Sequence, residues 1–429
     1  MRPEVIWMFV RLLLSNPLYS LHIIFASLSL LLQKAIIGLF TGTVSPVSVF
    51  YIYGRRKYLD VDAPLPINFL LLFGGWLKCE ALLKKNVTLY CTDQNFAYFV
   101  ETESHVNVYN SAVSPFVYIG QFNCAKKLYA IQIGDFLEYI RQLPQCTTKV
   151  ALLSNTGRCG STLLTQMLEG TGRVLALSEP ESFFYETSVC LKRGPGEPML
   201  GRIVPMLTFY AYCASIHGAY DLICIKLRMY SQCLVPVVHA HAPWIYHLYN
   251  YRNGIDTVES FMNFFDTYSK AVPVLKVLSV DFAKDLVTSL CSDDASETAD
   301  MATDGFSFAT WMVARALSEY MGFREKGINI PCVKYELLLE DPRGNLEALS
   351  HHFGLELTSD EIDNALLSLN KNSQEGLIFG RDNSFRRLKS KRHRDIRQDC
   401  VDICKRMGVP SIYSDELLPG VITTSRRRQ

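Results

Sequence analysis

The spacing of apolar and polar positions changes twice along the chain, and each change marks a different kind of segment. Residues 17–54 are mostly apolar and almost uncharged, broken only by one histidine, one glutamine and one lysine among their small hydroxyl residues. Since about 20 apolar residues can cross a bilayer as a helix, residues 12–33 predict a membrane helix and residues 35–53 a second, poorer one. A helix lying in the membrane plane and a hairpin buried in the protein core are the alternatives. We therefore predict an association with a membrane through residues 12–54.

From about residue 60 to residue 145 the pattern is typical of β-structure. Short runs of β-branched and aromatic residues alternate with Asp, Asn, Ser and Gly. These runs predict strands at 87–92, 96–101, 106–111, 116–121 and 128–133, followed by a helix at 134–143.

After Pro144 strand patterns alternate with helical ones. The strands are predicted at 150–154, 174–178, 222–227, 245–251 and 328–333, and the helices at 161–169, 203–216, 257–270, 306–321, 343–353 and 359–369. This alternation predicts an α/β fold with a parallel sheet flanked by helices. The domains are then 1–58, an apolar helical segment at the membrane; 59–145, a small β-rich region; and 146–429, the α/β domain.

Composition narrows the functional classes. The 429 residues are 49% apolar with a net charge of +1, which is sufficient for an extensive core and does not favour nucleic-acid binding. The 13 cysteines include no CxxC pair, and no cluster has the spacing of a metal site. No metal is therefore predicted.

The segment TGRCGSTLL, which starts at Thr156, follows a predicted strand and opens a predicted helix. Gly157 and Gly160 allow the backbone to approach an anion closely, and unpaired N–H groups at a helix start attract it. Arg158 adds a fixed charge, and Ser161 and Thr162 add hydroxyl donors. The segment predicts a phosphate-binding loop, with a plain strand–helix connection as the alternative.

The loop differs from that of nucleotidases. Those enzymes use GxxxxGK[ST], whose Lys contacts the β- and γ-phosphates. Here Ser161 stands where that Lys would follow Gly160. This favours a ligand with one terminal phosphate over a metal-bridged triphosphate.

A second segment, YRNGIDTVES, also joins a predicted strand to a predicted helix. Arg252 and Ser260 are spaced so that a guanidinium and a hydroxyl could hold another phosphate. In the alternative interpretation Arg252 pairs with Asp256 and Ser260 faces solvent.

Together these segments resemble two motifs of the sulfotransferases that use 3′-phosphoadenosine 5′-phosphosulfate. The loop RCGSTLL, which includes Cys159, resembles their 5′-phosphosulfate loop, and RNGID with Ser260 resembles their 3′-phosphate motif. The segment KYELLLEDP, starting at Lys334, is similar to a third conserved unit. The resemblance covers about residues 149–390. It implies a P-loop-type fold and metal-free transfer of a sulfuryl group to a hydroxyl or amine.

The resemblance also implies catalytic residues. Lys226 matches a lysine of the family that would stabilise the transferring group, whereas Arg228 stands where the cytosolic branch has its basic histidine. Arginine cannot accept a proton at neutral pH. The carbohydrate-type branch instead has a Glu-Pro pair, which is similar to Glu179-Pro180. We therefore predict Glu179 as the base, with a surface carboxylate as the alternative and Glu181 as the neighbour to exclude.

Two further assignments concern residues outside these motifs. The family covers the 3′-phosphate with a basic loop late in the chain, for which Arg381 is the candidate, with Arg386 as the second choice. His239 and His241 are interpreted as structural, with acceptor or metal binding as alternatives.

Two other functional classes stay open: a magnesium-dependent P-loop kinase or nucleotidase, and a non-catalytic nucleotide-binding descendant that acts as an interaction protein. The acceptor is expected to carry a hydroxyl group, on a carbohydrate, a lipid or another small molecule. The carbohydrate-type resemblance implies an endomembrane location such as the Golgi. The basic residues 55–57 and the scattered cysteines favour the cytosolic face instead.

Overall fold

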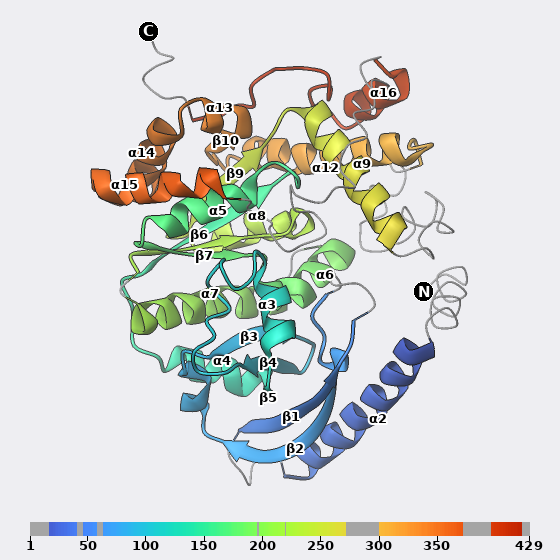
Figure 1. The fold of residues 1–429 in the computed structure, drawn as a ribbon, viewed down its shortest axis with the longest axis vertical. Helices are drawn as coiled ribbons and strands as arrows, with labels where there is room; N and C mark the ends of the chain where they lie inside the picture. Colours follow the sequence, from blue (N-terminus) through green and yellow to red (C-terminus); the bar gives the residue numbers. More distant parts are fainter. Residues whose placement is uncertain are drawn as a thin grey trace. The chain divides into compact units, whose positions relative to one another are not determined.

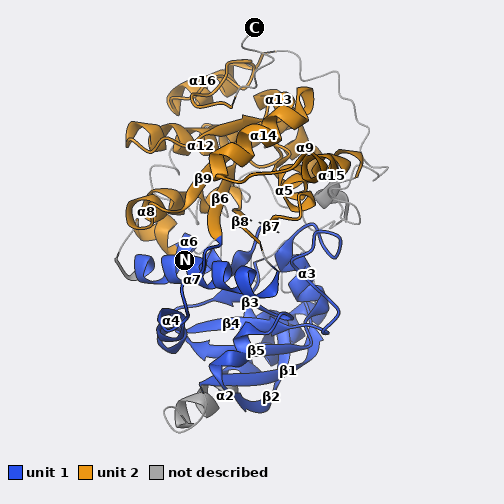
Figure 2. Ribbon diagram, turned by 90° about the vertical axis from the view of Figure 1, so that its left-hand side faces the viewer, with its two compact units in different colours: residues 1–148, 177–188, 197–219 blue, residues 149–176, 189–196, 220–429 orange. Residues whose placement is uncertain are grey.

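The computed structural model describes residues 17–40, 46–57, 63–194, 197–218, 220–271, 300–371 and 396–422. The chain divides into two compact units (Figure 2). Unit 1 comprises residues 1–148, 177–188 and 197–219, and unit 2 comprises residues 149–176, 189–196 and 220–429.

Unit 1 contains an antiparallel five-stranded sheet with the order β2-β1-β5-β4-β3 (Figure 1). Its strands are β1 (Val47–Arg55), β2 (Phe69–Leu77), β3 (Val87–Thr92), β4 (Phe96–Glu101) and β5 (Lys127–Gln132). Its helices are α2 (Pro17–Phe40), α3 (Val117–Cys124), α4 (Ile133–Arg141) and α7 (Glu197–His217), with part of α6 (Phe184–Arg193). The predicted strands at 87–92, 96–101 and 128–133 and the helix at 134–143 are confirmed.

The N-terminal apolar segment is not helical throughout. Residues 17–40 form a helix, but residues 47–55 form strand β1, which pairs with β2 and β5. A second membrane helix over 35–53 is therefore wrong. A continuous apolar run suits a buried strand as well as a helix, and the partner strands decided between them.

Two other predicted strands of this region are also wrong. Residues 106–111 form turns, and residues 116–121 lie mostly in helix α3. The fully buried Gln121 of α3 donates to Thr88 Oγ1 and to the carbonyl of Leu89 at 2.9 and 2.8 Å. These tertiary contacts outweigh the strand preference of the aromatic residues.

Helix α7 is the part of the described chain that is long and apolar enough to cross a membrane, over Met199–His217, and half of that stretch is buried within the protein. Its Arg202 Nε lies 2.8 Å from the buried carboxylate of Glu186 in α6. A buried ion pair of this kind is typical of a helix packed inside a folded domain.

Unit 2 contains a five-stranded sheet with the order β10-β9-β6-β8-β7, in which β6 runs parallel to β8 and β9, and β9 parallel to β10. The strands are β6 (Lys149–Asn155), β7 (Val174–Ser178), β8 (Leu222–Lys226), β9 (Tyr246–Tyr251) and β10 (Cys332–Lys334). The helices include α5 (Ser161–Gly170), α8 (Val235–His241), α9 (Gly254–Ala271), α12 (Gly305–Glu325), α13 (Tyr335–Glu340), α14 (Pro342–Phe353), α15 (Ser359–Leu366) and α16 (Gln398–Arg406).

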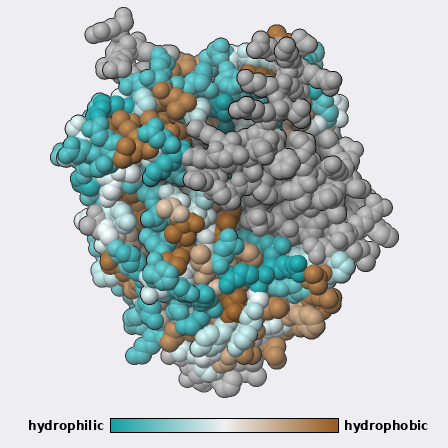
Figure 3. Space-filling model, viewed as in Figure 1, coloured by the Kyte–Doolittle hydropathy of each residue, from teal (hydrophilic) through white to brown (hydrophobic). Residues whose placement is uncertain are grey.

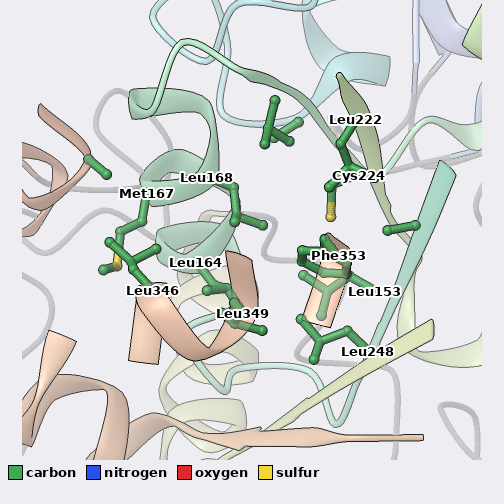
Figure 4. Packing of buried hydrophobic residues seen from close by; sticks show 14 of the residues in the cluster. Leu153, Leu164, Met167, Leu168, Leu222, Cys224, Leu248, Leu346, Leu349 and Phe353 are labelled. Carbon is green, nitrogen blue, oxygen red and sulfur yellow. The ribbon is translucent and has the colours of Figure 1, made fainter. Parts of the chain in front are cut away.

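Successive residues of β9 show that helices cover both faces of this sheet. Leu248 packs into a buried cluster with Leu164 of α5 and Leu349 of α14 (Figure 4). Tyr249 points to the opposite face, where its ring stacks on Tyr320 of α12 at 4.3 Å. The predicted α/β class, a parallel sheet flanked by helices, is confirmed.

The strands and helices predicted in unit 2 match observed elements closely, although α8, α13 and α16 were not predicted. The strand predicted at 328–333 is only three residues long, and it begins at Cys332. His239 and His241 lie in helix α8, just before strand β9.

Candidate functional site

The strands of unit 2 bring their carboxyl ends to one edge of the sheet. From the central strand β6 the chain continues to β7 and β8 on one side, and then to β9 and β10 on the other. The direction in which successive strands are added to the sheet therefore reverses between β6 and β9. Open parallel sheets bind ligands outside the carboxyl ends of the strands at this point.

The loop after β6 has an unusual backbone. Gly157, Arg158 and Gly160 have φ angles of +71°, +51° and +79°, in the left-handed region. For Arg158 this conformation costs about 1 kcal/mol or more, since its Cβ crowds the backbone. The loop is held by Asn155, whose Oδ1 accepts from the Gly157 N–H at 2.9 Å and whose Nδ2 donates to the Leu227 carbonyl at 2.8 Å.

Neither glycine of the loop has room for a side chain. A Cβ at Gly157 would lie 2.8 Å from the Phe261 ring, and a Cβ at Gly160 would overlap the ring of Tyr335. These glycines are needed for both their conformation and their close packing.

Cys159 is fully buried in the same loop, and its neighbour Asn250 explains its position. Asn250 Nδ2 donates to the Cys159 carbonyl at 2.8 Å and lies 3.2 Å from its Sγ. Asn250 is the penultimate residue of β9, so this contact ties the loop after β6 to the strand that leads to the second motif. The side chain of Cys159 is therefore packed inside the loop and held against β9.

The two predicted phosphate motifs meet through their side chains. Arg158 Nε donates to Ser260 Oγ at 3.0 Å, although the residues are 102 positions apart in sequence. Ser260 lies in α9, within two turns of its N-terminus. Ser260 therefore contacts the loop and is only partly exposed to solvent, which differs from the alternative considered from the sequence.

Lys226 supplies the lysine that the loop itself lacks. This lysine ends β8 and is 2% exposed, and its Nζ lies 3.4 Å from Thr162 Oγ1 at the start of α5. A nucleotidase loop carries its lysine within the loop. Here the neighbouring strand places a lysine against the first turn of the helix.

Arg252, the first residue after β9, is surrounded by acidic and aromatic groups. Its guanidinium lies 3.6 Å from Asp256 and 3.7 Å from Glu336, and 5.1 Å from the centre of the Tyr335 ring. The pairing with Asp256 considered from the sequence is therefore present. Tyr335 also packs on Gly160, so one ring contacts both motifs.

The first turn of α9 is already contacted by a carboxylate. Glu336 accepts from the backbone N–H of Asn253 at 3.1 and 3.3 Å, and Asn253 Nδ2 donates to Asp415 at 2.6 Å. An acidic side chain is stabilised near the N-terminus of a helix. An anion that approaches Arg252 would compete with Glu336 for these donors.

Glu179, the predicted base, follows β7 directly and belongs to unit 1. Its φ of +54° makes it, with Arg158, one of two non-glycine residues in the left-handed region among the residues described. Such strain is concentrated at functional sites. Glu186, seven residues later in the sequence, is engaged in the ion pair with Arg202, and burial raises the pKa of its carboxyl group.

The other candidates from the sequence are two arginines late in the chain and two histidines of α8. Arg381 and Arg386 lie outside the described residues. The ring of His239 packs on His247 with centroids 5.6 Å apart, and His241 Nδ1 lies 3.0 Å from the carbonyl of Val237. The part of the chain that the structure describes has no group of three or more His, Cys, Asp or Glu that could share a metal ion.

Sequence reasoning assigned no role to several residues that shape the site: Asn155, Asn250, Tyr335 and Glu336. Each lies at or next to the carboxyl end of a strand of the parallel sheet. Polar residues at such strand ends were the signal that could have identified them.

No protein-family model matches this sequence, and no curated protein matches it either. Among solved structures, the chain is similar to the sulfotransferase STF9 from Mycobacterium avium, with 10% identity over 56% of this chain and 72% of that one and a TM-score of 0.37. The sulfotransferase domain of the Synechococcus PCC 7002 olefin synthase shows 14% identity over 63% and 97%, with a TM-score of 0.34. The sulfotransferase domain of the curacin biosynthetic pathway shows 12% identity over 62% and 100%, with a TM-score of 0.37. These low scores carry no argument about this chain.

Proposed function

We propose that this protein is a sulfotransferase that moves a sulfuryl group from 3′-phosphoadenosine 5′-phosphosulfate to a hydroxyl or amine of an acceptor. The contact between Arg158 and Ser260 carries this proposal, because it joins the two motifs predicted to hold two different phosphates. A ligand with phosphates at both the 5′ and the 3′ position would use both motifs at once.

The residues at this edge of the sheet suit such a ligand chemically. The side chains of Arg158, Lys226 and Arg252 are cationic, and Ser161, Thr162 and Ser260 carry hydroxyl donors. The left-handed backbone of the loop is of the kind that turns successive N–H groups toward a bound anion. The first group would hold the 5′-phosphosulfate, and Arg252 with Ser260 the 3′-phosphate.

The nucleotide supplies an activated sulfuryl group, and the chain supplies charge and a base. Lys226, held beside Thr162, would stabilise negative charge on the sulfuryl oxygens. Glu179 would accept the proton of the acceptor hydroxyl. Arg228 cannot take that role because its guanidinium stays protonated, and it donates to Tyr230 at 3.1 Å.

Nucleotide binding tests the two-phosphate arrangement. Titration of the purified protein with 3′-phosphoadenosine 5′-phosphate and with adenosine 5′-phosphate should show at least about tenfold tighter binding of the first. Equal affinity for the two nucleotides would disprove the assignment of Arg252 and Ser260. Tight, magnesium-dependent binding of ATP would favour a kinase or nucleotidase instead.

Sulfate transfer to a panel of sugars, sterols, phenols and peptides tests the reaction itself. Glu179→Gln should lower kcat about 100-fold or more and leave nucleotide affinity unchanged. Glu181→Gln is the matched control, because this neighbouring glutamate is buried and should leave kcat within a few-fold of wild type. Nucleotide binding without transfer to any acceptor would favour a non-catalytic descendant.

A further inference from the structure

Helix α2 has the reverse of the usual distribution of side chains. Its polar residues face the protein: His22 Nε2 lies 3.2 Å from the carbonyl of Ile67, and Ser29 Oγ donates to the carbonyl of Leu71 at 2.8 Å. Ala26 between them is fully buried. The helix is therefore fixed along β2 and the residues just before it.

The opposite face of α2 is entirely apolar. Its side chains are 51% to 66% exposed, and they are Leu18, Leu21, Ile24, Phe25, Leu28, Leu31 and Leu32. In Figure 3 apolar side chains gather at the lower right, over α2. Soluble monomers rarely expose a continuous apolar patch larger than a few hundred Å². We name these seven side chains the outer face of α2.

Charge and composition indicate what covers this face. From Val5 to Leu59 the sequence has no Asp or Glu and five basic residues, and nine of the ten residues from Val5 to Leu14 are apolar. Protein interfaces mix aromatic, polar and charged groups, whereas the outer face of α2 carries only aliphatic side chains and one phenylalanine. An apolar face with basic and no acidic residues around it in sequence complements an anionic lipid surface.

We propose that the outer face of α2 inserts into one leaflet of a lipid bilayer, with the helix axis in the membrane plane. If α2 spanned the bilayer, it would have to separate from β2. The hydrogen bonds of His22 and Ser29 would then break, and these polar side chains would face lipid. In the in-plane arrangement the protein covers the polar side and lipid covers the apolar side. This inference does not depend on the proposed enzymatic activity.

Vesicle flotation of the full-length protein tests the proposal, with phosphatidylcholine vesicles prepared with and without phosphatidylserine. The wild type should float with both and more strongly with phosphatidylserine. Phe25→Glu with Leu28→Glu should weaken binding about 100-fold or more, because two side chains lose their burial in lipid. Leu339→Glu with Leu367→Glu is the matched control, with two exposed leucines of unit 2, and should bind as wild type does.

Further measurements keep the result interpretable. Thermal unfolding should be unchanged in both double variants; if the glutamate pair fails to fold, Phe25→Ser with Leu28→Ser replaces it. When the protein is bound to vesicles, a protease added outside them should cleave both an N-terminal and a C-terminal tag. Protection of the N-terminal tag alone would show a spanning helix and overturn the proposal. A wild type that ignores vesicles but dimerises through Phe25 and Leu28 would overturn it as well.

Discussion

Unit 2 has two strand-to-helix junctions at the candidate site, and they are built in different ways. After β6 the chain turns through left-handed Gly157, Arg158 and Gly160, so that the backbone itself forms the loop. After β9 the backbone has no residue in the left-handed region, and the junction depends on the side chain of Arg252 and the carboxylates around it.

The difference determines how each junction can change. The first has no space for an added atom, because aromatic rings contact both glycines. At the second junction, Arg252 already interacts with two carboxylates, and a bound phosphate would compete with them for its guanidinium. We therefore expect substitutions of the two glycines in the first junction to abolish nucleotide binding, and substitutions of charged side chains at the second to change nucleotide affinity by a limited factor.

The largest effect is expected from Gly160→Ala. The new Cβ would overlap the Tyr335 ring, and alanine is strained at a φ of +79°. We expect loss of nucleotide binding and a fall of about 2–4 kcal/mol in the free energy of unfolding, measured by denaturant titration. Gly172→Ala is the control, because its φ is +72° and no atom lies within 4 Å of the added Cβ. It should cost only about 1 kcal/mol, and equal losses would contradict the steric argument.

Arg252→Met should remove the interaction with the 3′-phosphate alone. Affinity for 3′-phosphoadenosine 5′-phosphate is expected to fall about 10- to 100-fold, since hydrogen bonds to charged groups contribute about 1.5–3 kcal/mol. Affinity for adenosine 5′-phosphate should not change. Arg158→Met should lower the affinity for both nucleotides, as measured by isothermal titration calorimetry. An equal loss of affinity for the two nucleotides in Arg252→Met would contradict the assignment of Arg252 to the 3′-phosphate.

The strands that lead to the junctions differ in their response to acid. Burial, with His239 and His352 nearby, lowers the pKa of His247 in β9 to about 4. Between about pH 6.5 and pH 4, His247 is protonated in the unfolded chain but stays neutral in the folded protein. The free energy of unfolding therefore decreases as the pH falls through this range, and above it His247 does not change the stability. Denaturant titration should show a loss of about 2 kcal/mol between pH 7 and pH 5. The loss should be smaller by about that amount in His247→Leu, in which His352, whose pKa is also lowered by burial, keeps its own contribution. An equal loss in this variant would assign it to other groups.

The smallest effect is expected from Glu336→Gln. The amide keeps an acceptor for the Asn253 N–H but no longer competes with a phosphate for Arg252. Affinity for the 3′-phosphate should rise about two- to threefold at low salt and less at high salt, since exposed ion pairs contribute under about 1 kcal/mol. Asp256→Asn should act in the same direction. A weaker affinity in both variants would mean that these carboxylates position Arg252 and do not compete for it.

Much of unit 2 could be predicted from local sequence. Its strands and helices alternate with clear periods. Motif spacing located Arg158, Arg252 and Ser260 at two strand-to-helix junctions, and the family resemblance located Lys226 at a strand end. The role of Tyr335 could not be predicted in this way. Its ring contacts Gly160, which is distant in sequence, and such contacts exist only in the folded sheet.

Unit 1 was harder to predict because its apolar runs are continuous. A continuous run shows neither the two-residue period of a strand nor the 3.6-residue period of a helix. Residues 47–55 and 116–121 were assigned to the wrong element, and β2 was not expected. Pairing of β1 with both β2 and β5 decided the first case, and the hydrogen bonds of buried Gln121 accompany the second.

The sequence by itself determined the α/β class of unit 2 and the residue types of two anion-binding segments, because periodicity and helix-start chemistry are local properties. Only the tertiary structure decided that Arg158 reaches Ser260, that Lys226 lies beside Thr162, and that α2 turns its polar side inward. These outcomes depend on strand order and on which face each neighbour covers, and no single segment of the chain encodes them.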